Sequence, residues 1–240
     1  KLARRVAHDL YGPEKHEIIA ALNSFHGRTL ATLTATGQDH YHHGFGPLPA
    51  GFDYVPYGDL DALKAIISDK TCAVMLEAVQ GEGGVHVPTA EYIQGVAALC
   101  KEHDALLIFD EIQAGMGRTG KFGSYENFGV KPDIITLAKG LAGGVPIGAF
   151  MATDKLAHTF APGDHGSTFG GNPLACAGAN VVLDTLLNGG LMENAATVGA
   201  YLKAQLEELQ KQFPTLIKEV RGLGLIVGAE LTKPGREIVN

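Results

Sequence analysis

The sequence predicts an α/β fold with a mostly parallel sheet and helices on both of its faces. Short apolar runs alternate with stretches of helical period along the chain, which is typical of a doubly wound sheet. Two of these runs also end in polar residues. Ala105–Phe109 is followed by Asp110 and Glu111, and 133–138 is followed by Lys139. Short continuous apolar runs are typical of strands buried on both faces, so both runs are expected to be parallel strands.

The first 152 residues supply the elements of this sheet. Glycine, proline and capping residues set most of the boundaries. In chain order, we expect a helix over Lys1–Leu10 that ends at Gly12-Pro13, a strand over Glu17–Leu22, a short helix over Arg28–Thr36, an irregular segment over Gly37–Phe52, a helix over Asp59–Ile67 capped by Asp59, a strand over Thr71–Glu77, an amphipathic helix over Thr89–His103, and strands over Ala105–Asp110, Ile134–Leu137 and Gly148–Ala152.

The last third of the chain has a different composition. A long helical stretch opens at Asn172-Pro173 and is broken at Gly189-Gly190, after which Lys, Glu and Gln become frequent. Val220–Leu231 is predicted to form a hairpin. We therefore divide the chain into a large domain over residues 1–187 and the start of a small C-terminal α+β domain over residues 188–240. Both domains are expected to be cut short, at the N-terminus and the C-terminus respectively.

Composition narrows the class of protein. The chain has 240 residues, of which 45% are hydrophobic, enough for one large α/β core. A formal net charge of −7 gives no indication of a nucleic-acid or membrane partner. The cysteines Cys72, Cys100 and Cys176 form no Cys-x-x-Cys pair and are expected to be reduced thiols of a cytoplasmic protein. No apolar run approaches the ~20 residues of a membrane span.

Three histidines in the irregular segment raise the question of a metal site. His40, His42 and His43 are close together in GQDHYHHGFG. Their surroundings match no ligand spacing of a metal centre, so we expect a surface loop and no metal.

An acid and a lysine at one sheet edge suit pyridoxal 5'-phosphate (PLP) chemistry. Ligands of open α/β sheets bind at the carboxyl ends of the strands. A lysine amine can form a Schiff base with the PLP aldehyde, while an acid keeps the pyridine nitrogen protonated. A structural salt bridge between Asp110 and Lys139 is the alternative, because ion pairs of the fold also place opposite charges together.

The sequence motifs around Asp110 and Lys139 favour a PLP site over a structural salt bridge. FDEIQAGMGRTG and ITLAKGL resemble the class III PLP-dependent aminotransferases, in their ω-amino-acid branch, also called subgroup II. ALNSFHGRT, QGEGG and HGSTFGGNPLACA look most like the members that act on N2-acetyl-L-ornithine. The resemblance covers essentially the whole chain. It implies fold type I and a cytoplasmic homodimer with shared active sites. A phosphate-binding turn and a C-terminal arginine of the family fall outside these residues.

The resemblance also implies a reaction. The distal amine of N2-acetyl-L-ornithine would pass to 2-oxoglutarate, a step of arginine biosynthesis. Succinylornithine, succinyl-diaminopimelate, ornithine and 4-aminobutyrate stay open as donors, as does a catalytically incompetent fragment. One departure is visible, because members often have Glu-Pro where this chain has Glu77-Ala78. We expect it to alter the exit of the strand rather than the chemistry.

Cofactor roles follow from the same resemblance. Lys139 would be the Schiff-base lysine and the carrier of the proton, and Asp110 would pair with the pyridine nitrogen. Gln113 would contact the phenolic oxygen, and Phe25 would stack on the ring. Thr168 would serve the cofactor phosphate of the neighbouring subunit.

Substrate roles concern two further residues. Arg28 would grip a substrate carboxylate, since a guanidinium binds a carboxylate through two hydrogen bonds. Glu82 would mask the C-terminal arginine in one half-reaction and release it in the other. His26 stands next to Phe25, and its role stays open.

Two nucleotide-binding classes are disfavoured. LLIFDE resembles the acidic strand of a P-loop ATPase, but the sequence has no G-x-x-x-x-G-K-[ST] loop, and Gly120-Lys121 is followed by Phe122. Gly222-Leu-Gly224 lacks a third glycine at the spacing of a dinucleotide-binding turn.

Overall fold

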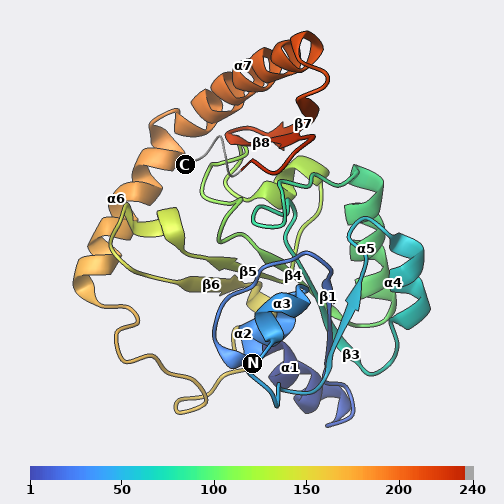
Figure 1. The fold of residues 1–240 in the computed structure, drawn as a ribbon. Coiled ribbons are helices and arrows are strands. Elements are labelled where there is room, and N and C mark those ends of the chain that lie inside the picture. Colours follow the sequence, from blue (N-terminus) through green and yellow to red (C-terminus); the bar gives the residue numbers. More distant parts are fainter. Residues whose placement is uncertain (236–240) are drawn as a thin grey trace.

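A six-stranded sheet forms the centre of the molecule (Figure 1). The computed structural model describes residues 1–235. The strand order is β2-β1-β3-β4-β5-β6, with β1 to β5 parallel and β6 antiparallel to β5. The strands are β1 (Glu17–Ala21), β2 (Phe52–Val55), β3 (Thr71–Leu76), β4 (Leu106–Asp110), β5 (Ile134–Leu137) and β6 (Ala149–Ala152). The predicted mostly parallel sheet is confirmed.

Helices and a separate hairpin complete the described part of the chain. The α-helices are α1 (Leu2–Tyr11), α2 (Leu30–Ala35), α3 (Asp39–His42), α4 (Leu60–Ile66), α5 (Ala90–Glu102), α6 (Pro173–Asn188) and α7 (Leu191–Gln212). Three 3-10 helices are η1 (Ser124–Phe128), η2 (Lys139–Ala142) and η3 (Asp154–Leu156). The hairpin consists of β7 (Ile217–Leu223) and β8 (Ile226–Leu231).

The core lies on both faces of the sheet, as β4 shows. Successive side chains of a strand point to opposite faces. Leu107 and Phe109 belong to the cluster that packs with α4 and α5. Leu106 and Ile108 belong to the cluster that packs with α1. Every residue of β4 is therefore buried, which explains why its sequence is a continuous apolar run rather than an alternating one.

Three helix starts follow the side-chain chemistry of N-capping. The carboxylate of Asp59 accepts a hydrogen bond from Ala62 N at 2.9 Å, as predicted for α4. Thr89 accepts from Tyr92 N at 3.2 Å at the start of α5. Asn172 accepts from Ala175 N at 2.9 Å, and Pro173 occupies the first turn of α6. Such caps satisfy amide groups that the helix itself leaves without a partner.

The structure differs from the expectation in the segment 37–52. This segment was expected to be irregular, but it contains the short helix α3, and its last residue, Phe52, begins the edge strand β2. Only Val55 of β2 is buried, so its sequence lacks the apolar run that marks the central strands. The hairpin also begins earlier than predicted, at Ile217 rather than Val220.

The hairpin is tied to the loops that follow β3 and β4. Leu225 N, in the hairpin turn, donates to Arg118 O at 2.8 Å. Arg221 Nε donates to Gly84 O at 2.8 Å, in the loop after β3. Helix α7 packs beside β7 (Figure 1).

No single helix within residues 1–235 is long and apolar enough to cross a membrane. Helices α6 and α7 reach the required length and hydropathy only as a pair, and they are bent by 67° at their junction.

Candidate active site

The carboxyl edge of the sheet carries the predicted acid and lysine. Asp110 is the last residue of β4 and stands beside Thr136 in the β4–β5 register. Lys139 follows β5 after one intervening residue and opens η2. Its backbone has a φ of 46°, which is uncommon for a residue other than glycine. Such conformations persist only where the surrounding structure holds them, and they are frequent at functional sites.

The carboxylate of Asp110 is held from two sides. Oδ1 accepts hydrogen bonds from Ile112 N and Thr136 Oγ1, both at 3.1 Å. Oδ2 lies 2.9 Å from Nδ1 of His26, whose side chain is fully buried. Asp110 itself is only 4% exposed. These contacts fix the carboxylate and leave acceptor capacity on Oδ2 for one further donor.

Lys139 is held by Gln113 rather than by the acid. Its Nζ donates to Gln113 Oε1 at 3.0 Å. Within residues 1–235, Asp110 and Lys139 form no ion pair. The structural salt bridge considered as an alternative from the sequence is therefore wrong for this part of the chain. The lysine amine and the carboxylate have separate partners, and both face the same cavity.

That cavity joins most of the residues proposed from the sequence. It has a volume of about 60 Å³ and is lined by Phe25, His26, Gly27, Glu77, Asp110, Ile112, Gln113 and Lys139. Lys139 and Gln113 also line a second cavity of about 660 Å³, formed with α6 and the hairpin. The lysine therefore lies between the end of the sheet and the C-terminal elements.

His26, whose role the sequence left open, makes the most specific contact with Asp110. One ring nitrogen faces the carboxylate, and Nε2 is buried without a hydrogen-bond partner among the described residues. A carboxylate beside Nδ1 gives that ring nitrogen a hydrogen-bond partner and orients the imidazole ring. His26 is therefore a candidate for orienting the acid.

Glu77 is a second residue for which sequence reasoning proposed no function. It directly follows β3, is 3% exposed and lines the cavity. Its oxygens accept hydrogen bonds from Phe25 N at 3.1 Å and Gly81 N at 3.4 Å. Burial is the main reason why its pKa is raised to about 7. The signal in the sequence was the same as for Asp110, a carboxylate at the end of an apolar run.

Arg28 and Glu82 lie outside this cavity, on the exposed side of Phe25. The Arg28 guanidinium carbon is 5.4 Å from the ring centroid of Phe25 and 4.3 Å from that of Tyr41. Glu82 accepts hydrogen bonds from Tyr41 Oη at 2.8 Å and Gln38 Nε2 at 2.6 Å. The two proposed substrate residues thus share one neighbour, Tyr41.

Thr168 is not brought to the other residues. It lies in the exposed segment between η3 and α6, and it does not line the cavity of Asp110 and Lys139. Its assignment to the cofactor of a neighbouring subunit stays a prediction.

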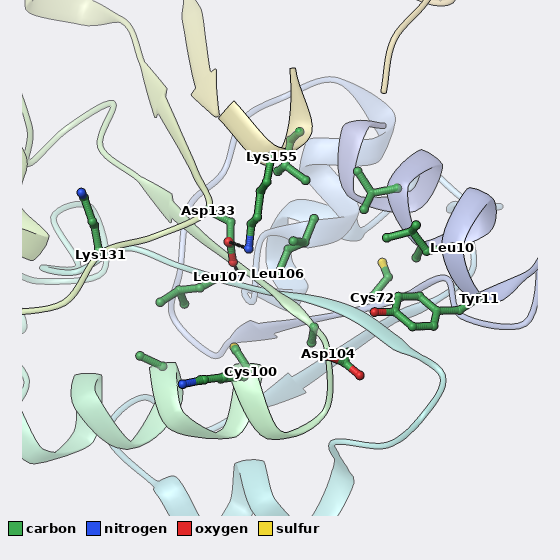
Figure 2. A pocket seen from close by; sticks show the side chains of 16 residues that line it. Leu10, Tyr11, Cys72, Cys100, Asp104, Leu106, Leu107, Lys131, Asp133 and Lys155 are labelled. Atoms are coloured by element: carbon green, nitrogen blue, oxygen red, sulfur yellow. Dashed lines mark hydrogen bonds and ion pairs between the residues drawn. The ribbon is translucent and has the colours of Figure 1, made fainter. Parts of the chain in front are cut away.

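A wider cavity lies at the opposite, amino edge of the sheet (Figure 2). Its volume is about 550 Å³, and it is formed by the starts of β3, β4 and β5 with the end of α1. Its lining includes Tyr11, Cys72, Asp104, Lys131 and Lys155. Asp133 and Lys155 form an ion pair there.

The fold and this edge define an α/β protein with a lysine and a fixed acid at the carboxyl ends of adjacent strands. The model of the family described as aminotransferase class III matches residues 1–240, and the chain belongs to this family. Class III aminotransferases are PLP-dependent.

Curated relatives agree with this family. The chain is 54% identical to an acetylornithine aminotransferase from Caldanaerobacter subterraneus, over 96% of this chain and 58% of the relative. It is 50% identical to one from Methanocaldococcus jannaschii, over 100% of this chain and 60% of the relative. The chain thus spans less than two thirds of the length of these proteins.

A solved structure has the same fold. The ornithine aminotransferase of Toxoplasma gondii superposes with a TM-score of 0.91 at 37% identity, over 96% of this chain and 56% of that one. A second structure of that enzyme is described with partial occupancy of PLP at the active site.

The residues present fit PLP. Asp110 offers a buried carboxylate with one acceptor position left on Oδ2, as a protonated pyridine nitrogen requires. Lys139 offers an amine on the same cavity, and Phe25 offers a half-buried aromatic ring. The three groups therefore meet the needs of the ring nitrogen, the aldehyde and one face of the ring.

Proposed function

We propose that this chain is part of a PLP-dependent transaminase that moves the distal amine of N2-acetyl-L-ornithine to 2-oxoglutarate. The observation that carries the proposal is the cavity shared by Asp110, Lys139, Gln113 and Phe25, in which the lysine and the acid are held by different partners. Names of the relatives support acetylornithine as the donor. The products would be N-acetylglutamate semialdehyde and glutamate. This reaction would be a step of arginine biosynthesis.

Each residue would contribute a defined part. Bound PLP supplies an electron sink and an aldehyde carbon for amines. Asp110 keeps the ring nitrogen protonated, because a buried carboxylate stabilises an adjacent cation. His26 keeps that carboxylate oriented. Lys139, when its amine is free, would accept a proton at Nζ from the substrate carbon that bears the nitrogen and would release it to the cofactor carbon bonded to the same nitrogen.

Gln113 and Phe25 would complete the cofactor contacts. Gln113 already accepts a hydrogen bond from Lys139 and would orient that amine while its own amide contacts the phenolic oxygen. Phe25 would cover one face of the pyridine ring. The Glu77 carboxylate holds the backbone of Phe25 in place, because it accepts a hydrogen bond from Phe25 N. These roles rest on the shared cavity and on the family.

Substrate binding would involve the exposed side of Phe25. Arg28 would grip a carboxylate of the donor or of 2-oxoglutarate. Glu82 would act as the acidic switch of the family, with an arginine outside these residues. Succinylornithine stays the nearest alternative donor, since a relative from Pseudomonas aeruginosa that is 51% identical carries both acetylornithine and succinylornithine in its name.

Assembly and location belong to the same proposal. The enzyme would be a cytoplasmic homodimer in which Thr168 reaches the partner's cofactor phosphate. Exposure of Thr168, away from its own cavity, supports this role. Residues 1–187 would form the large PLP-binding domain, and residues 188–240 would begin the small domain.

Visible spectroscopy of the full-length protein tests the function. After loading with PLP, we expect a yellow protein that bleaches with N2-acetyl-L-ornithine and recovers its colour with 2-oxoglutarate. A yellow protein that responds only to another ω-amine would overturn the donor and keep the class. A protein that stays colourless would overturn the class of reaction.

A further inference from the structure

Two side chains of opposite charge flank Tyr41 without pairing with each other. Arg28 lies over the tyrosine ring, with its guanidinium carbon 4.3 Å from the ring centroid. Glu82 accepts a hydrogen bond from the tyrosine hydroxyl at 2.8 Å. Within residues 1–235, Arg28 forms no ion pair. An arginine and a glutamate around one aromatic side chain would ordinarily be free to meet.

Each contact uses a different part of Tyr41. The guanidinium lies over the ring of Tyr41, and Arg28 has no hydrogen-bond partner among residues 1–235, so its N–H groups are open to an acceptor. The hydroxyl donates to Glu82, and this hydrogen bond is the main reason why the pKa of Tyr41 is raised. The hydroxyl therefore stays protonated and remains a donor.

Gln38 completes the restraint on Glu82. Its Nε2 donates to Glu82 Oε2 at 2.6 Å and also to Ser24 O at 3.0 Å, which anchors the amide to the backbone. Both oxygens of Glu82 are thus held by uncharged donors from residues 38–41. The carboxylate is thereby turned toward α3.

We infer that Tyr41 is a specificity-determining positioning residue that, together with Gln38, keeps Glu82 from forming an ion pair with Arg28. The free guanidinium edge then receives the carboxylate of the substrate. Tyr41 also meets Phe25 edge to face, with ring centroids 5.5 Å apart, which links this device to the wall of the cavity. The inference rests on the proposed function, because it concerns the carboxylate that Arg28 binds there.

Tyr41→Phe in the PLP-loaded, full-length protein is the direct test. The ring and its stacking on Arg28 stay, while the hydrogen bond to Glu82 is lost. Glu82 then competes with substrate for Arg28, so we expect KM for 2-oxoglutarate to rise about two- to five-fold at unchanged kcat. An exposed ion pair is worth a few tenths to 1 kcal/mol, which corresponds to a change of this size. The increase should shrink at high salt.

Rescue separates this role from a purely structural one. In a Glu82→Gln background, Tyr41→Phe should leave KM unchanged, because no charge remains to compete for Arg28. Tyr201→Phe, at a tyrosine that is 66% exposed on α7, is the matched control and should behave like the wild type. If Tyr41→Phe raises KM equally in both backgrounds, or does not raise it at all, the inference is wrong.

The wild-type protein distinguishes a failure of the role of Tyr41 from a failure of the proposed function. If it completes the spectral cycle and Tyr41→Phe matches it, only the role of Tyr41 is overturned. If it completes no cycle with any ω-amine, the proposed function itself fails.

Discussion

The two edges of the same sheet differ in how they use charged residues. At the carboxyl edge, Glu77, Asp110 and His26 are buried around a small cavity, and their polar atoms are bound by several loops. At the amino edge, a wider cavity has a lysine that is 61% exposed at its side chain and pairs with Asp133 (Figure 2). Asp133 also accepts a hydrogen bond from Leu107 N at 2.9 Å and so joins two strands.

This difference distinguishes a candidate functional site from a cavity that only results from packing. Burial of polar groups is costly unless they are hydrogen-bonded. A fold that buries a polar network must therefore supply hydrogen-bond partners for nearly all of its groups. Volume alone carries no such information. Chemistry is therefore expected at the carboxyl edge, where the polar groups are buried and hydrogen-bonded, and structural support at the amino edge.

The largest effect on kcat should come from substituting the lysine at the carboxyl edge. Lys139→Ala is expected to lower kcat by about 10³-fold or more, because the covalent link and the proton carrier are both lost. Lys155→Ala, at the amino edge, is the matched control and should leave kcat unchanged. The measurement is steady-state transamination of the PLP-loaded protein. Near-normal turnover of Lys139→Ala would contradict the assignment.

Asp110 and Asp133, one at each edge, should differ in what their substitution changes: kcat for the first and the free energy of unfolding for the second. Asp110→Asn is expected to lower kcat by about 10²-fold, because the ring nitrogen loses the negative charge that keeps it protonated. Asp133→Asn should keep kcat and lower the free energy of unfolding by about 1 kcal/mol, since its contacts hold strands and an exposed lysine. Kinetics and urea denaturation of both variants check this. Equal loss of kcat in the two variants would remove the distinction between the edges.

Glu77 should make stability depend on pH. Its pKa is raised from 4.5 to about 7, so the native state holds this proton more tightly than the unfolded chain does. Stability contributed by the neutral acid is therefore lost as the pH rises from 4.5 to 7, by up to about 3 kcal/mol. Glu77→Gln should flatten this decline in urea denaturation at pH 5 and pH 8. Parallel declines in variant and wild type would be evidence against this role.

Glu111 offers the matched comparison. Burial raises its pKa to about 7 as well, but its oxygens accept three hydrogen bonds, from Ser124 N and Oγ at 2.7 Å and from Tyr125 N at 3.3 Å. Glu111→Gln should therefore flatten the same decline and, because these hydrogen bonds are weakened, also lower the free energy of unfolding at both pH values. It belongs to the support of the loop after β4 rather than to the cavity.

The smallest effect concerns the thiols near the amino edge. Burial raises the pKa of Cys72 to about 11 and that of Cys100 to about 12. Both should resist iodoacetamide at pH 8 in the native protein, because the thiolate is the reactive form. Cys176, which is half-buried, should be alkylated first, as mass spectrometry of timed samples would show. Rapid alkylation of Cys100 would indicate that this edge opens.

Much of the site could be predicted because its residues stand in continuous stretches of sequence. Asp110 and Gln113 follow one apolar run and Lys139 follows the next, and parallel neighbours bring both ends to one edge. The contact of His26 with Asp110 could not be predicted in this way. It joins residues 84 positions apart, and only the folded register brings them together.

The sequence was also less informative where elements are short or exposed. Helix α3 has four residues and no buried side chain, so neither its period nor its role in placing Tyr41 was visible. β2 is an edge strand with a single buried residue, and its composition resembles a loop. The antiparallel direction of β6 depends on the path of the chain between residues 138 and 148, which hydrophobic pattern does not encode.

The most direct test of the central claim is the position of the covalent link to the cofactor. The full-length protein is loaded with PLP, reduced with sodium borohydride, digested and mapped by mass spectrometry. We predict a pyridoxyl group on Lys139, at the carboxyl edge of the sheet. A pyridoxyl group on Lys131 or Lys155 at the amino edge, with Lys139 unmodified, would contradict the account.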